Sequence, residues 1–306
     1  MTDDPFNRDH APTPGEVETL APGIRVVTAP NPGPMTFTGT RSFIVGQGEV
    51  ALIDPGPNDP AHLTALQNAT EGERVTAILI THAHIDHSAA AREAARIFDA
   101  PVMAHGDPVA ARSPLMSDLA ERFDLGGGEG IDATFTPDRT LRDGDTIDGP
   151  GWSLRAIHTP GHLADHLSFA LGDTIFSGDV AMGWAPALIS PPDGDLASWR
   201  NSIRTLLALK PTTLHPGHGA PVDSPALILD HLLSHRQSRE AQVLDALSSG
   251  PTTIPAMVTR IYADVDPRLH PAAARNVVAH LIDLVERGEV TCLGQLGPDA
   301  QFSLIG

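Results

Sequence analysis

The stretch RVTAILITHAHIDHSAAAREAARIF, residues 74–98, decides the fold because it predicts a strand, a turn and a helix in succession. Residues 74–82 are almost continuously apolar, as a strand covered on both faces of a sheet requires. Residues 88–98 place small apolar and charged residues at helical spacing, which predicts an amphipathic helix. The turn between them holds three imidazoles and one carboxylate, which belong to His82, His84, Asp86 and His87.

The spacing of these four side chains indicates two neighbouring points at which ligands gather. In an extended chain, residues two apart point to the same side, so His82 and His84 can face one point. Asp86 and His87 come after the turn, where the chain bends toward the helix, and they can face a second point nearby. Nitrogen and oxygen ligands around two close points are typical of a dinuclear metal site.

Three later segments also end a predicted strand with an imidazole or a carboxylate. These segments are HTPGH, SGD and HPGHG, and they carry His162, Asp179 and His218. Layered α/β folds usually place their sites at the carboxyl edge of the sheet, where all of these strands would end. We therefore expect the three side chains to lie near the 82–87 turn.

Composition limits the class of protein. The chain has 306 residues, which suggests one large domain and one small one. It contains no apolar run of about eighteen residues, so we expect no membrane contact. The single cysteine, Cys292, excludes an internal disulfide and indicates a cytoplasmic location. The net charge of −18 disfavours nonspecific binding to nucleic acid.

Changes in pattern along the chain predict two domains. We assign residues 1–235 to a catalytic domain, of which residues 1–20 are expected to be loose. Residues 236–306 contain helix signals followed by two short strands, which is the order of a winged-helix domain. Residues 106–140, with GGGEG at 126–130, are expected to form an irregular loop of the kind that often covers a site.

The charge of the C-terminal region bears on its role. Residues 236–300 contain six arginines and eight acidic residues, a net charge of −2. Winged helices that bind nucleic acid are usually basic. We therefore expect that this domain does not contact nucleic acid. It would instead pack on the catalytic domain, shape its cleft or form a homodimer.

The motifs H-x-H-x-D-H, T-P-G-H, S-G-D and P-G-H-G, in this order, resemble the metallo-β-lactamase superfamily over roughly residues 20–222. The resemblance implies an α+β fold, a four-layer αβ/βα sandwich with a small C-terminal winged-helix domain. Three features resemble the branch that contains β-lactamase-like protein 2, a single-strand endoribonuclease: HTPGH followed by Asp165 and His166, the stretch GDVAMGW that includes Asp179, and the winged helix. Ala185, Pro186 and Ala187 depart from the hydroxyl residues of that branch, which disfavours carrying its substrate over.

The resemblance also implies a role for each site residue. One metal would bind His82, His84 and His162, a second would bind Asp86, His87 and His218, and Asp179 would bridge both. Asp54 would support the ligand loop from behind. Redox di-iron relatives carry glutamate at the position of His84, so this chain resembles the hydrolases instead.

The donor types limit the metal and its chemistry. Imidazoles and carboxylates without thiolate suit two divalent ions, for which the resemblance favours Zn²⁺, with iron or manganese as alternatives. Water shared by two such ions has its pKa lowered toward about 7, so a bridging hydroxide can attack at neutral pH. Asp86 is the predicted catalytic residue, which would orient this hydroxide and return a proton.

Three hypotheses for function follow from these patterns. The preferred hypothesis is a dinuclear metal-dependent hydrolase acting on a small ester, thioester or amide-like substrate. An alternative is a metal-dependent endoribonuclease whose partner is single-stranded RNA. A third, from another class, is a non-catalytic metal-binding regulatory protein, which the complete ligand set argues against.

Overall fold

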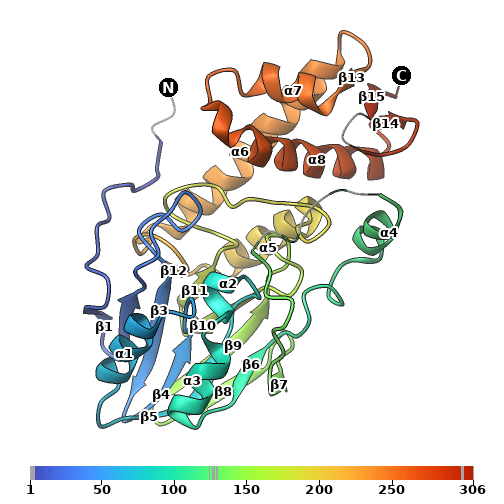
Figure 1. Ribbon diagram of the computed structural model, residues 1–306. Helices are drawn as coiled ribbons and strands as arrows, with labels where there is room; N and C mark the ends of the chain where they lie inside the picture. The colour runs from blue at the N-terminus through green and yellow to red at the C-terminus, as the bar shows by residue number, and fades with distance from the viewer. Residues whose placement is uncertain (1–3, 124, 126–127, 129, 298–299, 306) are drawn as a thin grey trace.

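A computed structural model of the chain shows two sheets packed face to face, with helices outside them and a mainly helical domain at one end (Figure 1). The structure describes residues 4–123, 125, 128, 130–297 and 300–305. The predictions made for residues 1–3, for three positions of GGGEG and for Gly306 lie outside the described residues.

The first sheet has seven strands that follow one another in chain order. They are β1 (Val17–Ala21), β2 (Ile24–Thr28), β3 (Arg41–Gln47), β4 (Glu49–Ile53), β5 (Arg74–Leu79), β6 (Val102–Ala104) and β7 (Arg139–Thr140). Pairing is antiparallel from β1 to β4 and parallel from β4 to β7. Parallel neighbours need crossover connections. These contain α1 (Pro60–Ala69) between β4 and β5, α2 (Ile85–Ser88) and α3 (Ala91–Phe98) between β5 and β6, and α4 (Pro114–Arg122) between β6 and β7.

The second sheet has five strands in the order β12-β11-β10-β9-β8. Their bounds are β8 (Thr146–Gly149), β9 (Trp152–His158), β10 (Leu167–Leu171), β11 (Thr174–Gly178) and β12 (Thr213–Pro216). β8 to β11 form an antiparallel meander, and β12 joins parallel to β11 after α5 (Leu196–Leu209). The carboxyl ends of β9, β11 and β12 therefore lie at one edge.

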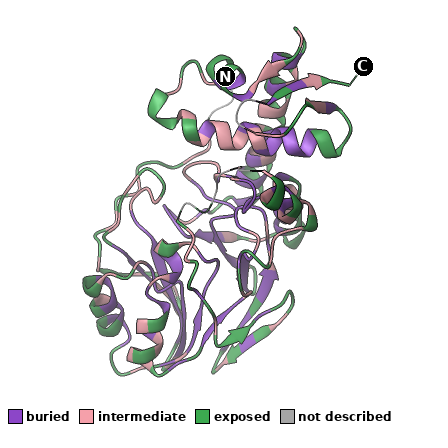
Figure 2. Ribbon diagram, turned by 45° about the vertical axis from the view of Figure 1, so that its right-hand side comes forward, coloured by how far each residue is buried: buried purple, intermediate pink, exposed green. Residues whose placement is uncertain are grey.

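Three apolar clusters hold the four layers together. Phe43 and Leu79 of the first sheet pack with Phe169 and Phe176 of the second. A second cluster joins the outer face of the first sheet to α1 and α3. A third joins the second sheet to α5 and α6 (Pro225–Leu247), around the fully buried Trp199. Figure 2 shows the buried strands between partly exposed helices, which confirms the predicted four-layer α+β sandwich.

The C-terminal elements form the predicted winged helix. They are the second half of α6, β13 (Thr252–Thr253), α7 (Ile254–Ile261), the 3-10 helix η1 (Pro267–Leu269), α8 (His270–Glu286), β14 (Val290–Leu293) and β15 (Gln301–Leu304). The small sheet has the order β13-β15-β14. The continuous helix α6 carries Leu232 in the core of the sandwich and Val243 in the C-terminal core. We therefore propose that the boundary between the two domains lies within this helix.

Helix α8 precedes the wing, the position of the helix that enters the major groove in DNA-binding winged helices. Here its middle is buried on the catalytic domain (Figure 2). Ile282 packs on Met116 and Leu119, and the Asp283 carboxylate accepts a hydrogen bond from Arg200 at 2.5 Å. The C-terminal domain therefore packs against the sandwich through α8, whose counterpart in DNA-binding winged helices enters the major groove.

The structure differs from the sequence-based predictions at three places. Residues 106–140 were predicted to be irregular, but α4 (Pro114–Arg122) forms there. Its start is capped by Ser113, whose hydroxyl accepts from the Met116 amide at 3.3 Å, and its apolar face packs against the distant α8. Residues 17–20, at the end of the segment expected to be loose, belong to β1.

The predicted helix over 88–98 is interrupted between α2 and α3. The Ala90 amide donates to the Gly56 carbonyl at 3.2 Å, so the backbone leaves the regular helical ladder at this point. Among the helices of the described residues, none combines the length and apolar character needed to cross a membrane.

Phe169→Ala tests the packing between the sheets, because Phe169 is fully buried there and two sheets cannot collapse into the cavity left behind. We expect the free energy of unfolding to fall by about 3–5 kcal/mol, measured by urea denaturation. Val17→Ala, at a residue that is 46% exposed, should change it by less than about 0.5 kcal/mol. A loss for Phe169→Ala no larger than that of the control would contradict this packing.

Candidate metal centre

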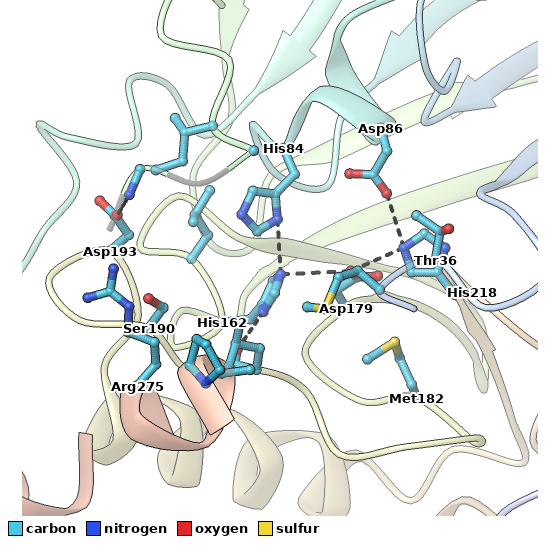
Figure 3. A pocket seen from close by; sticks show the side chains of 18 residues that line it. Thr36, His84, Asp86, His162, Asp179, Met182, Ser190, Asp193, His218 and Arg275 are labelled. Atoms are coloured by element: carbon cyan, nitrogen blue, oxygen red, sulfur yellow. Dashed lines mark hydrogen bonds and ion pairs between the residues drawn. The ribbon is translucent and has the colours of Figure 1, made fainter. Parts of the chain in front are cut away.

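The seven predicted ligands lie together at one edge of the sandwich, beyond the carboxyl ends of β5, β9, β11 and β12. Figure 3 shows the side chains of His84, Asp86, His162, Asp179 and His218 converging from different segments of the chain. The ligand atoms form three groups, each within 4.8 Å. The groups are His82, His84 and His162; His82, His87 and Asp179; and Asp86, His87 and His218.

The first set of three imidazoles is tightly gathered. His84 Nδ1 lies 2.9 Å from His82 Nε2 and 3.1 Å from His162 Nε2. Ligands of a tetrahedral ion, each about 2.1 Å from it, lie roughly 3.4 Å apart. These three nitrogens are therefore close to the spacing that one ion requires.

The second set mixes imidazole and carboxylate. His218 Nε2 lies 3.2 Å from Asp86 Oδ2 and 3.3 Å from His87 Nε2. His87 Nε2 lies 3.4 Å from Asp86 Oδ2. This spacing also matches the spacing expected around a single ion.

Asp179 reaches both sets. Its Oδ2 lies 3.3 Å from His218 Nε2 and 3.7 Å from His162 Nε2. Its Oδ1 lies 3.6 Å from His87 Nε2 and has no hydrogen-bond partner among the described residues, although it is buried. A buried oxygen without a partner costs free energy unless something binds it. The carboxylate thus lies between the two sets, where a ligand shared by two ions would have to lie.

Asp54 orients two of the imidazoles, His87 directly and His82 through the Thr81 hydroxyl. His87 Nδ1 donates to Asp54 Oδ2 at 2.8 Å, which leaves His87 Nε2 for a ligand. The Thr81 hydroxyl also donates to Asp54 Oδ2, at 2.7 Å, and so accepts from His82 Nδ1 at 2.9 Å. Asp54 has a left-handed φ of 52°, a strained conformation that its hydrogen bonds to Thr81 help to hold.

Backbone carbonyls hold two further imidazoles. His162 Nδ1 donates to the Leu188 carbonyl at 2.8 Å, and His218 Nδ1 donates to the Gly39 carbonyl at 3.3 Å. Each ring therefore presents Nε2 to the centre. Metal-binding histidines usually have their other nitrogen engaged in this way, which fixes the tautomer and the direction of the ring.

Electrostatics differ between the two sets. Burial lowers the pKa of His82 well below its usual value and that of His84 to about 3, so both imidazoles are neutral, as metal ligands must be. Burial alone would also lower the pKa of His218, but the carboxylates of Asp179 and Asp86 raise it to about 9. The carboxylates therefore make the second set a place where positive charge is favourable.

Among the histidines outside the predicted ligand set, His166 supports the site. Its Nε2 accepts from the Asp179 amide at 3.1 Å, and its Nδ1 lies 2.9 Å from the Thr159 hydroxyl. His158 instead stacks on His105 at 4.3 Å between ring centroids. His215 packs against two phenylalanine rings on the sheet.

Thr40, whose hydroxyl donates to Asp86 Oδ2 at 3.2 Å, was not predicted from the sequence. The carbonyls of Gly39 and Leu188 were not predicted either. Nothing in the sequence around Thr40 marks it, because it lies just before β3 of the first sheet and meets Asp86 only in the fold. A backbone carbonyl is carried by every residue and gives no sequence signal.

Two glycines allow the ligand segments to approach closely. A Cβ at Gly161 would lie 2.3 Å from Trp199 Cα, so the turn before His162 can lie against α5 only with glycine there. A Cβ at Gly217 would lie 2.5 Å from Asp179 Oδ1. The Pro-Gly pairs of the two motifs therefore create the space in which the ligands meet.

A cavity of about 430 Å³ opens beside the ligands. Its walls are mainly apolar, and at the end away from the ligands lie Ser190, Asp193 and Arg275 (Figure 3). The apolar lining comprises Met35, Ile131, Leu163, Met182, Leu188, Pro271 and Ala272. Because Pro271, Ala272 and Arg275 belong to α8, the C-terminal domain forms one wall of the cleft.

The described parts of the loop expected to cover a site do lie beside it. The Ile85 amide donates to the Gly130 carbonyl at 2.8 Å, and the Gly128 amide donates to Asp193 Oδ2 at 2.7 Å. Arg112 Nε in turn donates to Asp193 Oδ1 at 3.0 Å. Gly128, Gly130 and Asp193 all line the cavity, so this network shapes its wall.

Gly217→Ala tests the centre without removing a ligand. The new Cβ would lie 2.5 Å from Asp179 Oδ1 and 2.7 Å from His87 Cε1, so these side chains must move apart. We expect zinc affinity to fall about 10–100-fold, measured by competition with a chelator. Gly297→Ala is the control, because a Cβ there meets nothing within 4 Å. Equal zinc affinity in both variants would contradict the proposed geometry.

Comparison with protein families gives two matches. Residues 35–218 match the family described as Metallo-beta-lactamase superfamily. Residues 253–297 match the family described as Beta-lactamase associated winged helix domain. The first match spans more than half of the chain and contains the seven candidate ligands.

Similar curated proteins include a β-lactamase-like protein 2 homolog from Drosophila melanogaster, 29% identical, with 90% of this chain and 91% of that protein covered. An atrochrysone carboxyl ACP thioesterase from Aspergillus fumigatus is 30% identical, with 76% and 68% covered.

Among solved structures, a beta-lactamase domain protein from Burkholderia ambifaria has a TM-score of 0.80 at 20% identity, with 97% of this chain and 96% of that chain covered. A metallo-beta-lactamase family protein from Thermus thermophilus has a TM-score of 0.75 at 23% identity, with 94% and 100% covered. These two likenesses concern the fold. The two family matches, with the thioesterase relative, identify the chain as a hydrolase of the metallo-β-lactamase superfamily that carries the associated winged-helix domain.

Proposed function

We propose that this hydrolase uses two divalent cations, zinc in preference to iron or manganese, to cleave small thioesters or esters with an apolar acyl group. The observation that carries the proposal is the convergence of seven ligand side chains at one end of an apolar cavity. His82, His84 and His162 would hold one cation, and Asp86, His87 and His218 would hold the other. Asp179 would bridge them.

The donor set supports this choice of metal. Five imidazoles and two carboxylates, with no thiolate among the proposed ligands, suit zinc, iron or manganese. When bound, the two cations would lower the pKa of a shared water from about 15.7 toward about 7 and polarise the scissile carbonyl.

Asp86 is the proposed catalytic residue of the chain itself. It lies on the cavity wall with 23% of its side chain exposed, and the Thr40 hydroxyl fixes its Oδ2. In this position the carboxylate can orient the attacking oxygen and then pass a proton to the leaving group. Asp179, buried and fixed through its amide by His166, has no comparable access to the substrate.

The cavity supports a compact substrate with an apolar group. Its volume of about 430 Å³ falls within the usual range of small-molecule sites, about 300–1,000 Å³. The apolar side chains of Met182 and Leu188 favour burial of an acyl chain beside the scissile carbonyl. The name of the thioesterase relative supports thioesters and esters over amide-like substrates, which rank below them in this proposal.

Single-stranded RNA is a weaker candidate. Of the described residues that line the cavity, one carries a guanidinium, and this residue, Arg275, already donates to the Leu125 carbonyl. An RNA-binding groove needs several basic side chains along the phosphate backbone.

The cytoplasmic location expected from the single cysteine remains part of this proposal.

A substrate panel tests the proposal on zinc-loaded protein. The panel contains aliphatic acyl thioesters of N-acetylcysteamine, the matching oxygen esters and anilides, and a single-stranded RNA. We expect the highest kcat/KM for thioesters with apolar acyl chains, because the cavity wall is apolar. RNA cleavage in the absence of thioester and ester hydrolysis would overturn the proposal.

Asp86→Asn tests the catalytic residue. We expect kcat to fall about 10²–10⁴-fold, because the amide cannot accept and return a proton. Bound zinc per chain is measured on the same sample, so that loss of the ion can be separated from loss of the proton carrier. Asp148→Asn, at an exposed position on β8, is the matched control. Wild-type kcat in Asp86→Asn with both ions bound would rule out this role.

A further inference from the structure

The segment 187–189 connects the candidate metal centre to the C-terminal domain. The Leu188 carbonyl accepts from His162 Nδ1 at 2.8 Å, and the Leu188 side chain lines the cavity. The position of this one residue therefore affects two things, the direction of the His162 ring and the shape of the cavity wall.

The peptide groups of both residues next to Leu188 form hydrogen bonds with side chains of α6 and α8. Arg236, in α6, donates from Nη2 to the Ala187 carbonyl and from Nη1 to Asn276 Oδ1 at 2.8 Å. Asn276, in α8, accepts the Ile189 amide on the same Oδ1 at 3.5 Å. The two side chains thus form a clamp, Arg236 with Asn276, around the peptide groups on either side of Leu188.

The environment of Arg236 is costly for a cation. The residue is 2% exposed, its guanidinium lies 5.3 Å from the centre of the Trp199 ring, and none of the described residues forms an ion pair with it. Burying a guanidinium without a carboxylate partner is unfavourable unless its hydrogen bonds are satisfied by other groups. The bonds of Arg236 to Ala187 and Asn276 supply part of this compensation through Nη1 and Nη2, while the buried Nε has no hydrogen-bond partner among the described residues.

A second arginine in the same interface shows the contrast. Arg200, in α5, forms ion pairs with Asp283 at 2.5 Å and with Glu240. These contacts join the two domains, but among the described residues the hydrogen bonds of Arg200 go to these carboxylates and not to segment 187–189. Arg200 thus serves the interface alone, whereas Arg236 serves the wall of the site.

We propose that Arg236 and Asn276 are positioning residues for His162, through which the C-terminal domain sets the geometry of the first metal set. This inference rests on the proposed function, because His162 is a ligand only if the centre binds metal. In this proposal the winged-helix domain has a structural role in the metal centre. The domain would hold the ligand and the cavity wall in place without touching the reacting atoms.

Zinc binding tests the clamp directly. Arg236→Met removes the donors and keeps an apolar side chain on Trp199, and Asn276→Leu removes the acceptor. We expect one of the two zinc-binding steps to weaken about 10–100-fold in both variants, measured by chelator competition. His162→Ala identifies which step belongs to the first set. Asn276→Asp keeps an oxygen for both donors and should retain wild-type affinity.

Arg200→Met is the matched control, because it breaks ion pairs of the same interface without touching segment 187–189. It should lower the unfolding temperature and leave both zinc-binding steps unchanged. Equal weakening of the His162 step in Arg200→Met and Arg236→Met would show general loosening of the interface and overturn the inference. If Arg236→Met does not unfold cooperatively, the pair Asn276→Leu and Asn276→Asp decides.

The outcomes separate this inference from the proposed function. A wild-type protein that binds no zinc, iron or manganese would refute the proposed function. A wild-type protein that binds two ions, together with Arg236→Met and Asn276→Leu variants of unchanged affinity, would refute the positioning role alone.

Discussion

The burial of the Asp179 carboxylate among imidazole nitrogens is the constraint on which the structure of the site depends. A carboxylate that is 6% exposed, with one oxygen lacking a hydrogen-bond partner in the described part of the chain, needs positive charge nearby. The carboxylates raise the pKa of His87 and His218, so these two imidazoles can meet part of that need as imidazolium ions, whereas burial keeps His82 and His84 neutral. Divalent cations between the two sets would satisfy the carboxylate and the neutral imidazoles together. The tautomers are already arranged for this, because Asp54, Leu188 and Gly39 engage the outward-facing nitrogens.

The two-sheet fold makes this concentration of donors attainable. The 82–87 turn comes from the first sheet, and His162, Asp179 and His218 come from the second. Each donor therefore sits at the end of a strand whose body is buried in an apolar core, so the cost of gathering polar groups is offset by packing elsewhere. Glycines at the points of closest approach remove the side chains that would keep the segments apart.

Much of the fold and of the candidate site was predictable from the sequence. The features that were not predictable depend on contacts between distant parts of the chain. The 82–87 turn, the strand-ending motifs and the winged helix are local patterns of periodicity and donor type, and the structure brings all seven predicted ligands together. Helix α4 was missed because Met116 and Leu119 gain a core only from α8, far along the chain. The clamp of Arg236 and Asn276 was missed because it binds backbone groups, and such contacts depend on tertiary placement alone.

The C-terminal domain completes the cleft, since α8 supplies one wall and packs on α4 and α5. We propose that seven side chains hold two cations in this cleft. Diffraction from crystals grown with zinc, recorded on both sides of the zinc absorption edge, tests it most directly. We predict two anomalous peaks with Asp179 between them, one about 2.0–2.2 Å from the nitrogens of His82, His84 and His162. A well-ordered site with no peak, or with the zinc bound elsewhere, would contradict it.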